Sequence, residues 1–465
     1  MDFENSRHLA AAAQKIKIEY LRRARAASIS VQQAAANRDD PATGPVWVSK
    51  FTAPKPTDDT SRALLLSLVD EANEKGIQYD RPGSEPLHLE WTGFRANVSR
   101  DAAEPLFLEE QKFARLEAET KGPLTLLYIY GGSFTFVAPV LVRSKPQLIQ
   151  SRLNTPSSYR RVAGSLAQAT GSKVLMVRQR LAPQNPFPAA LLDVFQAYLA
   201  LLAPPPASPH RAVSPTNIVV VGDSSGACLA LGLLQVLLRL KRRNMSIVFH
   251  GQRVEPVVPA GMALLSPAME LTNGFPSWER NKHCDIFPTT AHDLPYLEED
   301  FPTCSIWPAR QPRANLYCDA GMLAHSLASP TASDSWAGSC PLWFGLGQEQ
   351  IADPARFVAQ TAHKQGVSVT LHEYESMPHN FFWYLHQSPQ ARKLIKDHAE
   401  AIVSFAKGGK PPSTACFFRA KGLGVESMDI ENLVPWTVAE AKVLMWKKTL
   451  DYKVPACHRR VQPLL

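Results

Sequence analysis

The feature that most constrains this chain is a series of short aliphatic runs separated by helix-like stretches. Most of these runs carry Val, Leu and Ile without alternating polar residues, which is typical of strands buried on both faces of a sheet. The stretches between them are long enough for helical crossovers. The sequence therefore predicts an α/β fold with a mainly parallel central sheet flanked by helices. The seven expected strands are residues 87–91, 124–130, 173–177, 217–223, 261–266, 340–347 and 367–374.

Some segments fall outside this alternation. Residues 1–83 are polar and helix-like and are expected to form an N-terminal helical or cap region, whereas residues 84–409 form the α/β domain. Residues 268–335 contain no strand-like run and are rich in Pro, Trp and Asp, so we expect a cap or lid inserted in that domain. Residues 410–465 follow a Gly/Pro break and form a C-terminal extension. Its helix-like run at 436–450 suits packing on the body of the protein or on a partner.

Composition narrows the class of protein. Hydrophobic residues make up 45% of the 465 residues and charged residues 20%, which suits a folded chain with a sizeable core. The net charge is +8, but the basic clusters are short and flank helix-like segments. We interpret them as solvated helix faces and expect no nucleic-acid partner. The longest apolar runs are shorter than a bilayer requires or carry a charge, so we expect no stable membrane insertion.

Two further patterns bear on location and on the cysteines. The first residues are acidic where a secretory or mitochondrial leader is basic, and no long apolar segment follows them, which favours a cytoplasmic location. The seven cysteines are scattered and form no C-x-x-C pair. This spacing argues against a disulfide framework or a zinc site.

The most informative motif is GDSSG at residues 222–226. It stands between a strand-like run and an apolar helix-like run, which is the context that G-x-S-x-G requires. A strand that turns sharply into a helix projects the hydroxyl of Ser224 above the edge of the sheet, and the two glycines remove Cβ atoms that would collide in that turn. Ser224 is therefore the candidate nucleophile. The alternative is a simple Gly/Ser turn into a helix N-terminus.

A serine hydroxyl needs a base, and in this architecture the base follows the acid in the chain. His379 comes just after the strand-like run 367–374, so it falls on a loop at the carboxyl end of that strand, where the sites of parallel sheets lie. His372 lies inside the same run, and His386 lies farther along on a helix-like stretch. His379 is the candidate base.

Glu349 and Asp353 compete for the role of the acid. Glu349 emerges just past the strand-like run 340–347. Asp353 stands four residues farther on, before Pro354, where a carboxylate also serves as the cap and dipole partner of a helix. Because Glu349 has no such structural reason to be there, it is the preferred acid, and Asp353 is the alternative.

Acyl transfer also needs N–H donors for the oxyanion of the tetrahedral intermediate. The strand-like run 124–130 ends in Gly131, Gly132 and Ser133, which places this loop early in the chain, as an oxyanion loop should be. Small residues let its backbone N–H groups turn toward the site. The candidate oxyanion residues are Gly131, Gly132, Ser133 and Ser225, and the preferred donors among them are the N–H groups of Gly132, Ser133 and Ser225.

Taken together, these segments resemble the hormone-sensitive-lipase-like branch of the α/β hydrolases. YIYGGSF is similar to the HGGG loop of that family, GDSSGA to its GDSAGG motif, and MPH at 377–379 to its histidine motif. The stretch VRQRLAPQNPFPAALLD resembles the signature R-L-A-P-E-x-P-F-P-A-A-x-x-D, and PAGMALLSPAMEL is similar to the segment G-x-x-L-x-S-P. The resemblance covers residues 85–405.

The resemblance implies ester hydrolysis by Ser224, His379 and an acid, without a metal or a cofactor. The family has a D-x-L-x-D pattern whose first position falls on Glu349 and whose last falls on Asp353. Glu therefore stands where Asp is usual.

Four other positions match or depart from the family. Tyr130 replaces the usual His of the oxyanion loop, and Ser133 replaces its third Gly, so the acyl pocket is expected to be narrower. Arg180 and Asp193 match family positions, and we interpret them as a buried scaffold pair that joins a strand to the following helix.

The sequence thus predicts a serine carboxylic-ester hydrolase, an esterase or deacetylase, that acts on a small or medium apolar ester through an acyl-enzyme. Two alternatives stay open. One is a ligand receptor or scaffold on a hydrolase body, since a fold does not determine a function. The other is acyl transfer to an alcohol or amine by the same residues. The sequence does not predict the oligomeric state.

Overall fold

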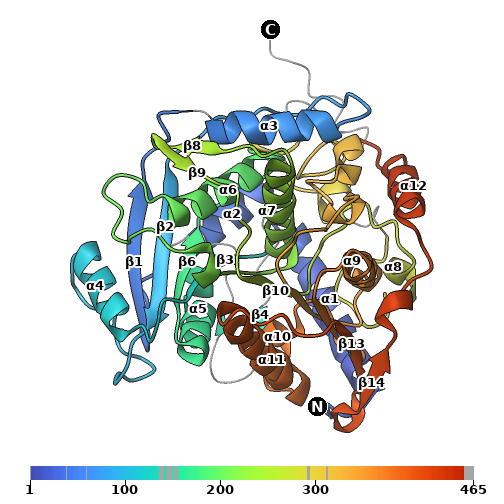
Figure 1. Cartoon of the computed structure of the whole chain (residues 1–465). Coiled ribbons are helices and arrows are strands. Elements are labelled where there is room, and N and C mark those ends of the chain that lie inside the picture. The colour runs from blue at the N-terminus through green and yellow to red at the C-terminus, as the bar shows by residue number, and fades with distance from the viewer. Residues whose placement is uncertain are drawn as a thin grey trace.

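A ten-stranded sheet forms the centre of the protein (Figure 1). The computed structural model describes residues 2–454 apart from residues 38, 59, 136–140, 143–148, 151–155, 291–293 and 310–312. The strands of the central sheet are β1 Val46–Ala53, β2 Leu87–Phe94, β3 Thr125–Ile129, β6 Lys173–Val177, β7 Ile218–Asp223, β10 Gly261–Leu265, β11 Leu342–Gly347, β12 Val369–Tyr374, β13 Thr414–Phe418 and β14 Val425–Met428. Their spatial order is β1-β2-β6-β3-β7-β10-β11-β12-β13-β14.

Most neighbouring strands in this sheet are parallel. Every pair from β6 through β3, β7, β10, β11 and β12 to β13 is parallel, whereas β2 is antiparallel to both β1 and β6 and β14 is antiparallel to β13. Every residue of β3, β7, β10 and β11 is buried, which explains their continuous apolar sequences. The predicted α/β fold with a mainly parallel sheet is confirmed.

The sheet extends farther toward both ends of the chain than expected. Residues 1–83 contain the helices α1 (Ser6–Arg25), α2 (Ile29–Ala36) and α3 (Thr60–Ala72), but the prediction of a helical region is wrong at β1, which forms an edge of the sheet beside β2. After residue 409, β13 continues the sheet beside β12 and β14 closes its other edge. β1 and β13 join the sheet beside strands that are distant in the sequence, whereas β14 pairs with β13, the strand just before it. A pattern in adjacent residues does not reveal the distant pairings.

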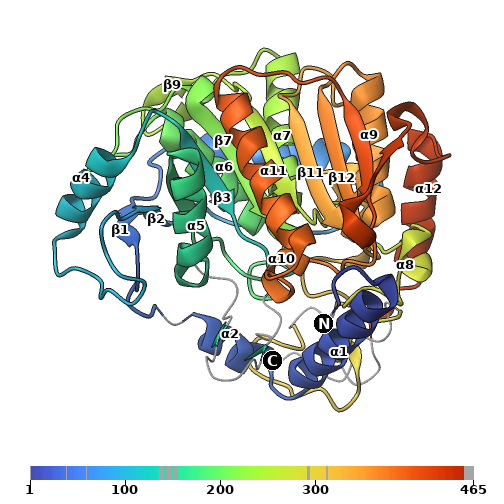
Figure 2. The same ribbon diagram turned by 90° about the horizontal axis from the view of Figure 1, so that it is seen from below.

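Helices cover both faces of the sheet (Figure 2). α5 and α11 pack on one face, and α6, α7 and α9 pack on the other, where α3 lies against α6 and α7. By length and composition α7 could cross a membrane, but 89% of its most apolar stretch is buried inside the structure. The bounds of these helices are α5 Pro156–Thr170, α6 Ala189–Leu202, α7 Ser224–Arg242, α9 Ala352–Lys364 and α11 Pro389–Ala406.

Short helices and irregular segments make up the described part of residues 268–335, which contributes no strand to the sheets. Helix α1 packs on this region. Nε2 of Gln14 donates to the carbonyl of His283 (2.9 Å), and Arg25 forms an ion pair with Glu298 (2.6 Å). The described helices of this region are α8 Ser277–Arg280, η3 Pro295–Leu297, η4 Ala320–Ala324 and η5 Pro330–Ala332.

The other described elements lie elsewhere in the chain. They are α4 Glu109–Glu119, β4 Leu141–Val142, β5 Ile149–Gln150, η1 Pro215–Asn217, β8 Ile247–Phe249, β9 Gln252–Val254, α10 Phe381–Tyr384, η6 Lys421–Leu423, η7 Ile430–Asn432 and α12 Val438–Thr449.

The C-terminal helix α12 packs on the body of the protein, one of the two alternatives left open by the sequence. Ala441 and Met445 are fully buried, and Trp436 meets Phe275 edge-to-face with ring centroids 5.4 Å apart. The six cysteines within the described residues are free, and Cys457 lies outside them.

The predicted pairing of Arg180 with Asp193 is confirmed. The backbone N–H and Nε of Arg180 donate to the Asp193 carboxylate at 2.7 and 2.9 Å. Asp193 is buried in α6, so the pair joins the loop after β6 to the helix that follows it.

A second buried ion pair joins α5 to the edge of the sheet. The guanidinium of Arg160 donates to both carboxylate oxygens of Glu90 in β2, at 2.9 and 2.5 Å, and to Asp39 at 2.7 Å. Both Arg160 and Glu90 are buried. Because two buried charges neutralise each other here, the loss of Arg160 leaves the carboxylate of Glu90 without its guanidinium partner in a nonpolar environment.

We expect Arg160→Met to lower the free energy of unfolding by about 3 kcal/mol, because it leaves Glu90 buried and unpaired. Arg161→Met is the matched control, since Arg161 is exposed on the same helix, and its effect should stay below about 0.5 kcal/mol. Urea denaturation of the two variants measures both values. Equal losses in both variants would contradict this account of the ion pair.

Candidate active site

Ser224 occupies the sharp turn that joins β7 to α7. It is the first residue of α7, and its φ of 52° lies in the left-handed region that a side chain rarely adopts. Strained backbone of this kind persists where the surrounding structure holds it, and it concentrates at functional sites. The turn places the serine side chain at the carboxyl end of β7, as the G-x-S-x-G motif predicts.

Two glycines allow the neighbouring loop to approach this turn closely. A methyl group on Gly226 would collide with the carbonyl of Ile129 at the end of β3. A Cβ on Gly131 would stand 2.9 Å from the Cβ of Ser224 and 2.7 Å from the carboxylate of Asp223. The close packing of the loop after β3 against the serine turn therefore requires glycine on both sides.

The structure brings Ser224, His379 and Glu349 together, although they are 155 and 30 residues apart. Nε2 of His379 lies 2.8 Å from Oγ of Ser224, and Nδ1 lies 2.7 Å from Oε2 of Glu349. Because a carboxylate only accepts hydrogen bonds, Nδ1 carries the ring proton and Nε2 is free to accept from the serine hydroxyl. The three side chains form one continuous hydrogen-bonded chain.

Glu349 is held in place by two further donors. Its Oε1 accepts hydrogen bonds from the hydroxyl of Ser266 (2.6 Å) and from the N–H of Gly347 (2.8 Å), and its side chain is fully buried. These bonds orient the carboxylate so that Oε2 points at the imidazole. Ser266 was not singled out from the sequence, although it is the serine of the segment that resembles G-x-x-L-x-S-P.

Asp353 lies at a different place, near the start of α9. Its carboxylate accepts from the N–H of Ser277 (2.9 Å) and pairs with Arg280 (2.5 Å). Within the described part of the chain, no hydrogen bond or ion pair joins Asp353 to His379. Asp353 thus joins α9 to α8, which is the structural role that its position before a proline suggested.

The surroundings of His379 raise the pKa of its imidazole. Burial lowers the pKa of its imidazole, but the negative charge of Glu349 and the hydrogen bond to it raise the pKa, and Asp285 and Asp223 add to that effect. The net pKa is above the ordinary value for histidine. A base of this strength is suited to take the proton of a serine hydroxyl near neutral pH.

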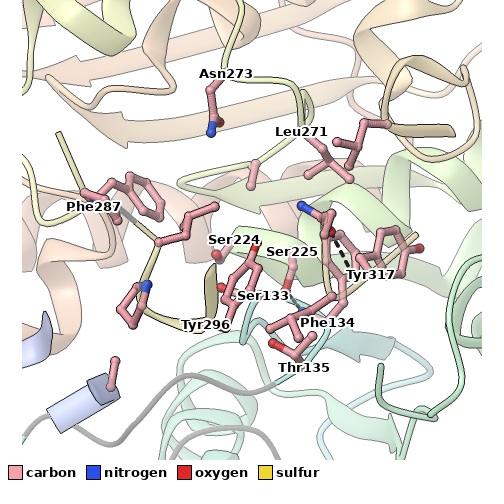
Figure 3. Close-up of a pocket in the computed structure, with 18 of the residues that line it drawn as sticks. Ser133, Phe134, Thr135, Ser224, Ser225, Leu271, Asn273, Phe287, Tyr296 and Tyr317 are labelled. Atoms are coloured by element: carbon pink, nitrogen blue, oxygen red, sulfur yellow. Dashed lines mark hydrogen bonds between the residues drawn. The ribbon is translucent and has the colours of Figure 1, made fainter. Parts of the chain in front are cut away.

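The loop after β3 presents backbone N–H groups beside Ser224. The N–H groups of Gly132, Ser133 and Ser225 donate to no residue that the structure describes, whereas the N–H of Gly131 donates to Asp223 (3.3 Å). Gly131 is therefore engaged in holding the loop, and the other three N–H groups are the ones open to a ligand. Figure 3 shows Ser133, Ser225 and Ser224 close together at the pocket.

Two buried carboxylates at the site were not singled out from the sequence. Asp223 accepts from the hydroxyls of Tyr128 (3.1 Å) and Tyr159 (3.0 Å) and from Gly131. Burial raises the pKa of Asp223, the hydrogen bonds from these three donors lower it, and the net pKa is about 6. Asp223 lies inside the GDSSG motif, so the sequence contained a signal for it.

The other carboxylate, Asp285, comes from the region 268–335. It accepts from the N–H of His379 (2.8 Å) and the N–H of Gln350 (2.6 Å), and so binds both the loop that carries the histidine and the loop that carries Glu349. Burial and the charge of Glu349 raise the pKa of Asp285 to about 6. Its sequence surroundings have no motif that could have indicated this position.

A small apolar pocket opens beside the serine (Figure 3). Its volume is about 170 Å³. Its walls come from α1, α2, the oxyanion loop, residues 268–335 and the C-terminal segment, and they include Tyr20, Gln32, Phe287, Tyr317 and Tyr452. Helices α1 and α2 and residues 268–335, which the sequence predicts to form a cap, all contribute to these walls. The described part of the chain has no group of three His, Cys, Asp or Glu side chains arranged to hold a metal ion.

Comparison with known proteins agrees with this geometry. A family model described as alpha/beta hydrolase fold matches residues 151–383, half of the chain. The chain belongs to the α/β hydrolases.

Several relatives are similar to this α/β hydrolase. An acetyl-hydrolase of Streptomyces hygroscopicus is 30% identical over 285 residues, covering 61% of this chain and 76% of the relative. An esterase of Acinetobacter venetianus is 26% identical over 304 residues, covering 64% of this chain and 81% of the relative. A crystal structure of a hormone-sensitive lipase from a metagenome library has the same fold, with a TM-score of 0.50, 21% identity, and coverage of 84% of this chain and 97% of that one.

Asp285→Asn tests whether that carboxylate positions the loops that carry His379 and Glu349. The substitution removes an acceptor for one of the N–H groups and a negative charge near His379, so kcat should fall between about tenfold and a hundredfold. The pKa of the acid limb of kcat/KM should also move down, because the charge of Asp285 raises the pKa of His379.

Hydrolysis of p-nitrophenyl acetate across pH 5–9 gives both quantities. Asp319→Asn is the control, since Asp319 is exposed and only caps η4. An unchanged acid limb together with reduced stability would assign Asp285 a purely structural role.

Proposed function

We propose that this protein is a serine carboxylic-ester hydrolase that cleaves small apolar esters through an acyl-enzyme on Ser224. The observation that carries the proposal is the hydrogen-bonded chain from Ser224 through His379 to Glu349. The relatives named acetyl-hydrolase and esterase support an ester-hydrolysing enzyme. The alternative of a non-catalytic receptor or scaffold is therefore not retained. The assignment of individual roles to the residues is our proposal.

In the first half of the reaction, Oγ of Ser224 attacks the ester carbonyl while Nε2 of His379 takes its proton. Glu349 stabilises the imidazolium and keeps the ring in the required tautomer. The oxyanion accepts hydrogen bonds from the N–H groups of Gly132, Ser133 and Ser225. As the tetrahedral intermediate collapses, His379 returns the proton to the leaving alkoxide, which departs as the alcohol.

In the second half, a water molecule replaces the alcohol. His379 takes a proton from the water as its oxygen attacks the acyl carbonyl, and the same N–H groups bind the new oxyanion. Collapse breaks the bond to Oγ of Ser224, which recovers its proton from His379, and the carboxylic acid leaves. Transfer to an alcohol or amine differs only in the acceptor, and methyl ester formation in added methanol measures its share.

The pocket favours a short acyl group. Its volume of about 170 Å³ is close to that of engineered protein cavities that bind a single benzene ring, roughly 150 Å³. Phe134 and Tyr317 stack on each other in its wall with ring centroids 3.7 Å apart, which makes that side rigid. The relative named acetyl-hydrolase supports the same substrate class.

Labelling with a fluorophosphonate probe tests the proposal without knowledge of the substrate. We expect one adduct, on Ser224, located by mass spectrometry, and its loss in Ser224→Ala and His379→Ala. Ester hydrolysis by Ser224→Ala should fall by about a millionfold, to the level of the residual oxyanion and binding contributions. A folded wild-type protein that acquires no adduct would overturn the proposal.

The two candidate acids are separated by matched amide substitutions. Glu349→Gln should reduce kcat by between about a thousandfold and ten-thousandfold, because it removes the partner that fixes the tautomer of His379. Asp353→Asn should mainly lower thermal stability, because it weakens the contact with Arg280. The reverse order of activity losses would assign the acid to Asp353.

The pH profile gives a further test of Glu349. In the wild type, kcat/KM should rise with pH as His379 loses its proton, with an apparent pKa above the ordinary value for histidine because the net pKa of His379 is raised. In Glu349→Gln this limb should move to lower pH, since the charge that stabilises the imidazolium is gone. Steady-state rates from pH 5 to 9 measure the shift, and an unmoved limb would contradict the role of Glu349.

A further inference from the structure

We propose that a second cavity, between α3, α7, η4, η5 and α12, is a binding site for the phosphate group of a phosphomonoester. This proposal is independent of the proposed function, because the cavity lies at the opposite end of α7 from Ser224. Arg239 is fifteen residues after Ser224 along that helix, which at 1.5 Å per residue places the two about 22 Å apart. Figure 1 shows this end of α7 beneath α3.

The cavity is built from separate parts of the chain. Its volume is about 490 Å³, larger than an inorganic phosphate fills, so it has room for an organic part. Residues 235, 239 and 242 line it from one face of α7, since they are spaced by three to four residues, and residue 243 lines it from the end of that helix. The other walls come from the end of α3, the segments around η4 and η5, and α12.

Cationic side chains outnumber anionic ones in these walls. The five cationic residues are Lys75, Arg239, Arg242, Arg243 and Lys442, against the three carboxylates of Glu71, Glu74 and Asp334.

Two of the carboxylates are already engaged. Glu71 pairs with Arg243, and Asp334 pairs with Lys442 at 2.6 Å. Glu74 is exposed and solvated.

Arg239 and Arg242 lack a carboxylate partner among the described residues. Nη2 of Arg239 donates to the hydroxyl of Ser326 (2.6 Å), and Nη2 of Arg242 donates to the carbonyl of Ser335 (3.0 Å). Both acceptors are neutral, and each guanidinium has five N–H donors. Most of their hydrogen-bonding capacity therefore remains for a ligand.

Arg239 is the group that most needs an anion. Its side chain is half-buried. Burial is the main cause that lowers the pKa of Arg239 and repulsion from Arg242 is the second, whereas the negative charge of Asp334 raises this pKa. A guanidinium remains charged at neutral pH in any case, so its partial burial without a paired carboxylate is unfavourable. An anion bound between the two guanidinium groups would remove that cost.

Phosphate fits this arrangement better than a carboxylate does. Two guanidinium groups present planar forks of N–H donors, and a phosphate has enough oxygens to accept from both at once. The indole of Trp446, over which Lys75 lies at 4.2 Å, gives the cavity an apolar wall for the organic part. Basic residues in the last turn of α7 have an alternative explanation, because a helix C-terminus attracts cations. That explanation does not account for the other segments of the chain that surround these residues and enclose the cavity.

Isothermal titration calorimetry of the full-length protein, at constant ionic strength set with sodium chloride, tests this site. The two probes are inorganic phosphate and glycerol 2-phosphate. We expect saturable binding of both, tighter for glycerol 2-phosphate because the cavity accommodates its organic part. Tighter binding of inorganic phosphate would overturn the assignment to a phosphomonoester.

The variants Arg239→Met and Arg242→Met should each weaken phosphate binding by about tenfold or more. Lys241→Met is the matched control, because it removes the same charge from the same helix end without lining the cavity, and its binding should change less than about twofold. Arg242 is exposed, so its variant should fold even if Arg239→Met does not. Circular dichroism spectra and thermal unfolding curves that match those of the wild type verify folding of each variant.

Absence of saturable binding by the wild type would overturn the proposal. So would equal weakening by Lys241→Met and Arg242→Met, which would identify a general effect of net charge instead of a site.

Discussion

The left-handed turn at Ser224 is the constraint on which the rest of the site depends. It exists because β7 ends against the loop that follows β3, with Gly226 and Gly131 leaving space where any Cβ would collide. One turn thus orients the serine side chain, brings the N–H of Ser225 beside it, and holds the oxyanion loop within reach. The parallel order β3-β7-β10-β11-β12 then delivers the other groups to the same edge of the sheet.

Around this turn the protein gathers three buried carboxylates near one imidazole. Each carboxylate is satisfied by its own set of donors: hydroxyl groups and an N–H for Asp223, backbone N–H groups for Asp285, and Ser266 with Gly347 for Glu349. Buried charges are tolerated only when they are hydrogen-bonded in this way. Their combined field raises the pKa of His379 against the effect of burial. The loops that carry the histidine and the acid are consequently linked through Asp285.

The pocket shows a different principle, since both ends of the chain contribute to it. Tyr20 comes from the first helix, Tyr452 from the C-terminal segment, and Phe287 from the region between β10 and β11. The ring of Phe287 also lies 4.6 Å from the ring of His379, so the wall of the pocket and this imidazole are in contact. A large part of the pocket wall therefore comes from segments that carry none of the family motifs.

The sequence by itself determined the strands of the inner sheet, the serine turn and the choice of His379 and Glu349 as candidates. These features are local: a buried strand, a glycine-flanked turn and the first residues after a strand each leave a pattern in adjacent residues. Only the tertiary structure decided that β1 and β13 extend the sheet, that Asp353 binds Arg280 and not the histidine, and that Asp285 bridges two loops. Those outcomes depend on contacts between residues far apart in the chain, and a carboxylate has the same local sequence signature whether its partner is an arginine, an imidazole or a pair of backbone N–H groups.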